Sequence, residues 1–182
     1  MKKVIFTAIL AISTAVSVNA QWKAGADLGI QIPIGTFGDA YNLGVGGTVA
    51  GEYLITESIG AGLQLGYFSF GGKEVMGMET GSMSVVPITA TGKYYFMREG
   101  FKPYAGLDLG FYVLSYESPD LFGLGSITVS ETKFGLAPVL GLQYEFSDNW
   151  ALDGNLKYNY VAASGDALST FGINVGIVYT IE

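Results

Sequence analysis

The chain has 182 residues, a formal net charge of −7 at neutral pH, and a composition that is 49% hydrophobic. It contains no cysteine and no histidine, which excludes disulfide bonds and removes the commonest metal ligand and general base. An acidic chain with only nine Lys and Arg residues does not have the composition of a nucleic-acid-binding protein.

The first twenty residues have the pattern of a secretory signal peptide. Lys2 and Lys3 precede an apolar run, which closes on the small residues around Asn19 and Ala20. Cleavage after Ala20 is expected. A transmembrane helix is the alternative, but the apolar run is shorter than the roughly 20 residues that a membrane span requires. Residues 1–20 are therefore predicted to be a signal peptide and residues 21–182 a single mature domain.

Residues 43–70 show the pattern that recurs through the rest of the chain. Apolar and small or polar residues alternate from Leu43 to Ile55, stop at a three-residue polar break, and resume from Ile59 to Phe70. Period-two alternation on both sides of a short break predicts a β-hairpin. Each arm is long enough for a tilted strand to cross a bilayer, which takes roughly 9–11 residues.

The same pattern predicts eight strands, at residues 22–33, 43–55, 59–70, 84–96, 102–116, 132–146, 150–161 and 170–181. The breaks between them alternate in length, with tight turns at 56–58, 97–100 and 147–149 and longer loops at 34–42, 71–83, 117–131 and 162–169. No helix is expected beyond the signal peptide, because glycine is frequent and no segment keeps a 3.6-residue apolar period. The fold class is therefore all-β, an eight-stranded antiparallel up-and-down transmembrane β-barrel, with its short turns on the periplasmic side.

One face of every predicted strand is apolar and free of charge, which favours contact with lipid over contact with water. The alternative is a soluble lipocalin-like barrel with the apolar face inside. In that case the opposite face would be exposed to water, yet it is rich in glycine and sparse in charge. A narrow lumen crowded with side chains explains the glycines better.

Aromatic residues gather near the predicted periplasmic ends of the strands, as expected for an interfacial girdle. These residues are Trp22, Tyr53, Tyr94, Phe96, Tyr144, Phe146, Trp150 and Tyr179.

Pro87 and Pro138 fall inside predicted strands, where a closed barrel has no free edge for a residue without an N–H. A β-bulge near each proline is expected.

The chain resembles the small outer-membrane β-barrel family, the OmpA/OmpX-like group of eight-stranded barrels. The resemblance is carried by the strand Val86-Pro87-Ile88-Thr89-Ala90-Thr91-Gly92-Lys93-Tyr94-Tyr95-Phe96 and the following segment Lys102-Pro103-Tyr104-Ala105-Gly106-Leu107-Asp108-Leu109-Gly110. It covers nearly all of residues 21–182 and implies a standalone barrel in the bacterial outer membrane. Members commonly end on a terminal aromatic residue, whereas this chain ends Tyr179-Thr180-Ile181-Glu182.

Charged and amide side chains on the inward face predict a polar network that fills the lumen. The candidate residues are Asp27, Glu52, Gln64, Lys93, Asp108, Lys133, Glu145, Asp153 and Lys157. Because buried charges need partners, Lys93 and Lys157 are each expected within ion-pair distance of Glu52, Asp108, Glu145 or Asp153. A polar path or gate is the alternative interpretation of the same residues.

No catalytic, cofactor-binding or metal-binding residues are predicted. The known enzymes among small outer-membrane barrels use a histidine as the base, and this chain has none. Carboxylate pairs such as Glu74 and Glu79, or Glu117 and Asp120, are interpreted as solvated loop charges.

The expected function is a structural or surface-interaction role. The expected partners are membrane lipid and a surface ligand or envelope protein that contacts loops 71–83 and 117–131. A monomer is expected, and a narrow porin or small-molecule transport barrel is the alternative.

Overall fold

The computed structural model describes residues 21–75, 78–79, 81–117, 128–162 and 167–181. The predicted signal peptide, residues 1–20, lies outside this range and stays a prediction. The described residues contain no helix that is both long and apolar enough to cross a membrane.

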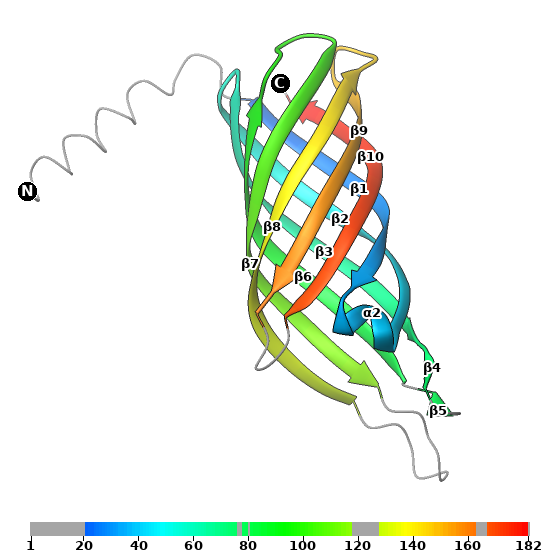
Figure 1. Cartoon of the computed structure of the whole chain (residues 1–182). Coiled ribbons are helices and arrows are strands. Elements are labelled where there is room, and N and C mark those ends of the chain that lie inside the picture. Colours follow the sequence, from blue (N-terminus) through cyan, green and yellow to red (C-terminus); the bar gives the residue numbers. More distant parts are fainter. Residues whose placement is uncertain (1–20, 76–77, 80, 118–127, 163–166, 182) are drawn as a thin grey trace, which may run out of the picture.

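Eight long strands form one closed antiparallel barrel (Figure 1), in agreement with the predicted fold class. They are β1 (Gln21–Ile34), β2 (Tyr41–Thr56), β3 (Ile59–Gly72), β6 (Ser82–Tyr95), β7 (Phe101–Glu117), β8 (Thr128–Glu145), β9 (Trp150–Val161) and β10 (Leu168–Ile181). Each strand pairs with its neighbours in the chain, and β1 pairs with β10 from Trp22↔Ile181 to Ile34↔Ser169. The closure leaves the barrel wall without a free edge along this seam.

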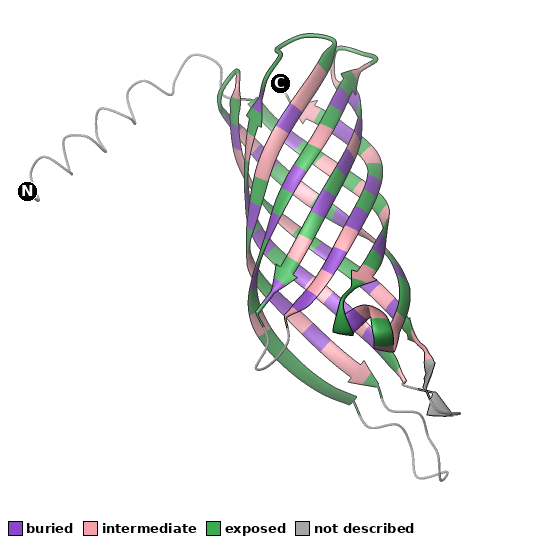
Figure 2. Cartoon of the chain, viewed as in Figure 1, coloured by how far each residue is buried: buried purple, intermediate pink, exposed green. Residues whose placement is uncertain are grey.

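Exposure alternates along every strand and produces the banded pattern in Figure 2. On β8, for example, Leu140 points outward and is 63% exposed, whereas Val139 points inward and is 5% exposed. The predicted apolar register is the outward face on all eight strands. An apolar outer surface on all eight strands suits contact with lipid.

The two ends of the barrel differ as the break lengths predicted. The tight turns and both ends of the described chain lie at one end (Figure 1), which is the periplasmic end of the predicted topology. At the β2–β3 turn, Thr56 Oγ1 accepts hydrogen bonds from the backbone N–H groups of Ser58 and Ile59. At the β6–β7 turn, Gly100 has a φ of 65°, a conformation that glycine adopts without strain.

The end of the barrel opposite the tight turns, which we call the outer end, contains two elements where the sequence predicted only loops. A short helix, α2 (Thr36–Ala40), lies between β1 and β2. A small hairpin of β4 (Glu74–Val75) and β5 (Met78–Glu79) lies between β3 and β6. The expectation of no helix was therefore wrong. One turn of helix is too short to show a 3.6-residue period, and a tertiary contact, the burial of Phe37, holds it in place.

The expected bulges at the two prolines were also wrong. The β3–β6 ladder skips Pro87 but keeps one register, because Leu65↔Ile88 and Phe68↔Val85 belong to the same alignment. The β8–β9 ladder skips Pro138 in the same way, between Leu136↔Tyr160 and Val139↔Lys157. Opposite Pro87 stands Gly66, where an added Cβ would come within 2.9 Å of the proline ring. Gly66 leaves space for the Pro87 ring. The β3–β6 ladder therefore lacks pairing at Pro87 but needs no extra residue, so no bulge forms.

Candidate functional site in the barrel lumen

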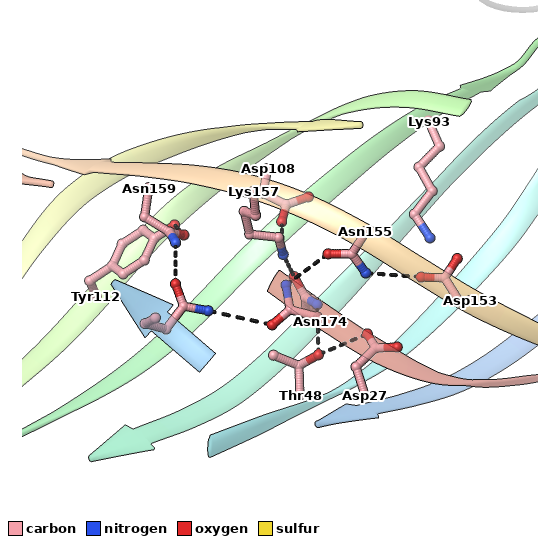
Figure 3. Close-up of polar contacts among 12 residues, drawn as sticks. Asp27, Thr48, Lys93, Asp108, Tyr112, Asp153, Asn155, Lys157, Asn159 and Asn174 are labelled. Atoms are coloured by element: carbon pink, nitrogen blue, oxygen red, sulfur yellow. Dashed lines mark hydrogen bonds and ion pairs between the residues drawn. The ribbon is translucent and has the colours of Figure 1, made fainter. Parts of the chain in front are cut away.

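Lys157 on β9 lies at the centre of the polar side chains in the lumen (Figure 3). Its ammonium group is 2.6 Å from Asp108 Oδ2 on β7 and donates to Gln64 Oε1 on β3 at 2.7 Å. In the closed strand order, β9 and β3 stand on opposite sides of the barrel. The Lys157 side chain and its partner Gln64 therefore span the full width of the lumen.

Gln64 extends this chain of contacts to the charge on β1. Its amide donates to Thr48 Oγ1 at 2.9 Å, and the Thr48 hydroxyl donates to Asp27 Oδ2 at 3.1 Å. The four predicted residues Asp108, Lys157, Gln64 and Asp27 thus belong to one hydrogen-bonded series, with Thr48 as the additional member.

A second ion pair joins β2 and β6 nearer the end of the barrel with the tight turns. Lys93 Nζ is 2.8 Å from Glu52 Oε2, and Tyr95 donates its hydroxyl hydrogen to Glu52 Oε1 at 2.7 Å. The Lys93 ammonium also lies 5.0 Å from the ring centroid of Tyr104. Glu52 is buried, so a cation and a hydroxyl donor offset the loss of hydration of its carboxylate.

Asp153 is held by donors from two strands. The Tyr104 hydroxyl donates to Asp153 Oδ1 at 3.0 Å, and Asn155 donates to the same atom at 2.9 Å. Asn174 on β10 then donates to Asn155 at 2.8 Å, and Gln31 on β1 donates to Asn174 at 3.4 Å. These amides link Asp153 to the outer half of the lumen.

Glycines on β10 make room for the long polar side chains. Gly176 pairs with Asp27 on one side and Asp153 on the other. Gly172 stands in the same way between Gln31 and Lys157. A Cβ at Gly172 would come within 2.6 Å of the Gln31 amide. Neighbouring long side chains therefore lie over the inward glycines, against the barrel wall. This is the crowded lumen that the glycine-rich inward face predicted.

Two of the predicted network residues lie apart from the others. Lys133 is near the outer end of β8 and lies 3.0 Å from Glu131 on the same strand. Glu145, at the tight-turn end of β8, forms an ion pair with Lys102. The network prediction placed both on the inward register but could not show that neither reaches the central series.

Two inward cations were missed from the sequence. Lys23 is buried, donates to Gln143 Oε1 at 3.3 Å, and lies 4.8 Å from the ring centroid of Tyr95. Lys102 pairs with Glu145. The signal was available, because Lys23 shares the alternating register of Asp27, and Lys102 that of Asp108. These two inward cations, Lys23 buried and Lys102 partly buried, bring the charge of the lumen closer to balance.

A polar cavity lies among Asp27, Lys93, Asp108, Asp153 and Lys157. It has room for about two to three water molecules. Asp153 Oδ2 is buried and has no hydrogen-bond partner among the described residues. A bound water in this cavity would hydrate such an atom.

The predicted aromatic girdle residues lie on the outside of the barrel, and several of them form ring pairs. Trp22 packs on Tyr53 at a centroid distance of 5.1 Å, and Trp150 packs on Tyr179 at 4.9 Å. The remaining predicted residues, Tyr94, Phe96, Tyr144 and Phe146, are also exposed. Phe101, which the sequence analysis did not include, stacks on Tyr144 at 4.6 Å. Such pairs contribute stacking energy beyond the burial of their area.

The polar side chains of the lumen are suited to stabilising the barrel by contacts with one another. In the part of the chain that the structure describes, no group of three or more acidic side chains could hold a metal ion. The charged groups contact one another, amides and tyrosine hydroxyls, and the sequence provides no imidazole to act as a base.

Comparison with known proteins gives the family. The family model of the outer membrane protein β-barrel domain matches residues 4–180. An uncharacterized protein of Haemophilus influenzae is 25% identical over 183 residues, which cover 99% of each chain. Neisserial surface protein A has a similar crystal structure, with a TM-score of 0.69 and 18% identity over 90% of this chain and 100% of that one. A major outer membrane protein from Thermus thermophilus has a TM-score of 0.65 and 17% identity over 90% of this chain and 100% of that one.

The solved structures support the fold, and the family match extends over nearly the whole chain. The protein therefore belongs to the outer membrane protein β-barrel domain family and is located in the bacterial outer membrane.

Proposed function

We propose that this protein is a non-conducting barrel with a structural or surface-interaction role. Its short turns face the periplasm and its longer loops face the medium, as in outer-membrane barrels generally. The observation that carries the proposal is the Asp108–Lys157–Gln64 series, which spans the lumen from β7 and β9 to β3. Side chains in direct contact across the full width of a barrel leave no continuous path for a hydrated ion.

The outer end is the part of the molecule that is available for partners. Loops 71–83 and 117–131 were predicted as contact surfaces, and residues 76–77, 80 and 118–127 lie outside the described residues. The flanking hairpin of β7 and β8 is exposed from Thr128 to Thr132. Because the lumen is filled, a partner outside the cell would contact this outer surface and not the interior of the barrel.

Conductance of the wild-type protein tests the proposal. Purified protein refolded into planar bilayers is expected to give no stepwise current, whereas a porin inserted in the same bilayers gives regular steps. Liposome swelling with a small sugar provides a second measurement. Steady, uniform conductance steps from the wild type would overturn the proposal. They would favour the narrow transport barrel instead, for which the polar cavity beside Asp153 is the supporting observation.

Single cysteines test the orientation, since the natural chain has none. Ser130→Cys lies on the exposed outer hairpin, and Ser58→Cys lies in the short β2–β3 turn. In intact cells, a membrane-impermeant thiol reagent is expected to label Ser130→Cys and to leave Ser58→Cys unlabelled until the cells are broken. The reverse pattern would contradict the proposed topology.

A further inference from the structure

The outer half of the lumen is filled by hydrophobic side chains. One cluster of buried residues comprises Phe37, Phe68, Phe70, Met83, Val85, Tyr112, Leu114, Val161 and Leu168, and we call it the outer apolar layer. Five strands contribute to it, β3, β6, β7, β9 and β10. From the sequence we expected polar residues to fill the lumen, and this apolar layer was not predicted.

The boundary between the two layers runs through one residue. The ring of Tyr112 belongs to the outer apolar layer, while its hydroxyl donates to Asn159 at 3.3 Å. Asn159 in turn donates to Gln31 Oε1 and to Thr170 Oγ1, both at 3.0 Å. A small cavity lies at this boundary, lined by Thr170, Phe70 and their neighbours.

Phe37 is the member of the layer that comes from outside the barrel wall. It is carried by α2, which lies at the end of the barrel opposite the chain termini (Figure 1). Its ring is 5.3 Å from Phe70 and 5.0 Å from Tyr41 between centroids. Lys73 ties α2 to the end of β3, because its backbone N–H donates to Ala40 O at 2.9 Å and its ammonium donates to Gly38 O.

We propose that α2 is a lid whose Phe37 side chain closes the outer end of the lumen independently of the polar network. A hydrated solute would lose its water in the outer apolar layer, and dewetted constrictions of this kind act as barriers. The other members of the layer are fixed in hydrogen-bonded strands. Phe37 can leave without breaking the barrel ladder, so the opening step is local and needs no change in the ion pairs.

Cysteine accessibility beneath the lid tests this proposal. Thr170 is 3% exposed and close in size to cysteine, so Thr170→Cys reports on access to the floor of the layer. In a chain without other cysteines, a negatively charged methanethiosulfonate added from outside is expected to modify it much more slowly than Ser130→Cys. Adding Phe37→Asp should accelerate the modification of Thr170→Cys about tenfold or more, because a carboxylate is not stable in an apolar cluster and α2 would be displaced.

Two controls separate the lid from other causes. Thr36→Asp places the same charge on the exposed side of the same helix and should leave the rate unchanged. Lys157→Gln disturbs the polar network and should also leave it unchanged. Each variant is first checked for the compact, heat-modifiable band of a folded barrel, and Phe37→Ser replaces Phe37→Asp if the latter does not fold.

Three outcomes would overturn the proposal. They are rapid modification of Thr170→Cys with an intact lid, an unchanged rate in folded Phe37→Asp or Phe37→Ser, and acceleration by Lys157→Gln instead. The last result would make the polar network the outer closure as well. None of these readings depends on whether the wild type conducts, so the lid and the non-conducting barrel fail separately.

Discussion

The ring of Tyr104 on β7 lies across Gly141 on β8, directly opposite it in the ladder, and its hydroxyl donates to Asp153 on β9 at 3.0 Å. The glycine gives the tyrosine the space to reach a carboxylate two strands away. Phe68 lies over Gly46 and Glu52 over Gly60 in the same manner. The inward glycines therefore determine which long side chains can cross the lumen.

Gly141→Ala is expected to destabilise the barrel by about 1–3 kcal/mol, since a methyl group there would overlap the Tyr104 ring. Gly154→Ala on β9 is the matched control, because an added Cβ at that position meets nothing within 4 Å. It should be neutral or slightly stabilising. Equilibrium unfolding in urea with lipid vesicles measures both changes, and equal values would contradict this packing.

Lys157→Ala is expected to lower the free energy of unfolding by about 3–5 kcal/mol, because Asp108 would remain buried without its cation. Arg98→Ala is the control. Arg98 pairs with Glu57 at 2.6 Å, but both side chains are at least half exposed, so its removal should cost about 1 kcal/mol or less. The double substitution Lys157→Met with Asp108→Leu should recover part of the lost stability. A loss no larger than that of Arg98→Ala would show that the buried pair is dispensable.

Leu140→Arg should impair insertion, because the side chain points to lipid between the two aromatic ends of β8. The expected cost is about 2–4 kcal/mol at the bilayer midplane. Thr132→Arg, on the outward register of the same strand nearer its outer end, should cost about 0–1 kcal/mol. The fraction of heat-modifiable, folded protein after refolding into vesicles provides the measurement. Similar yields for the two variants would mean that Leu140 does not face the hydrocarbon midplane.

The two tryptophans are expected to report on one membrane interface. Trp22 and Trp150 are both exposed and both lie at the end of the barrel with the tight turns, packed on Tyr53 and Tyr179. Their fluorescence should be quenched more strongly by lipids brominated near the headgroup than by lipids brominated near the chain end. Trp22→Phe leaves Trp150 as a single probe and should give the same depth. Stronger quenching near the bilayer centre would place the girdle at the wrong level.

The wall of the barrel could be predicted from the sequence alone. Strand positions, the choice of outward face and the assignment of short and long connections all follow from period-two alternation and its breaks. These signals are local, because successive side chains of a strand point to opposite faces whatever the rest of the chain does. The aromatic positions Trp22 and Trp150 followed from the same alternation. So did the inward position of Lys157, together with the inward positions of Lys23 and Lys102 that were overlooked.

The partners of these side chains depend on the three-dimensional fold. Lys157 and Gln64 are 93 residues apart and stand on opposite strands, so their contact depends on the register and tilt with which the sheet closes. The same closure leaves Lys133 beside Glu131 and outside the central series. Phe37 gave no periodic signal, because one turn of helix is too short to show a 3.6-residue period. The helix is stabilised instead by the burial of Phe37 against Phe70. A local pattern fixes the direction of a side chain, whereas its partner is fixed by the three-dimensional closure of the barrel.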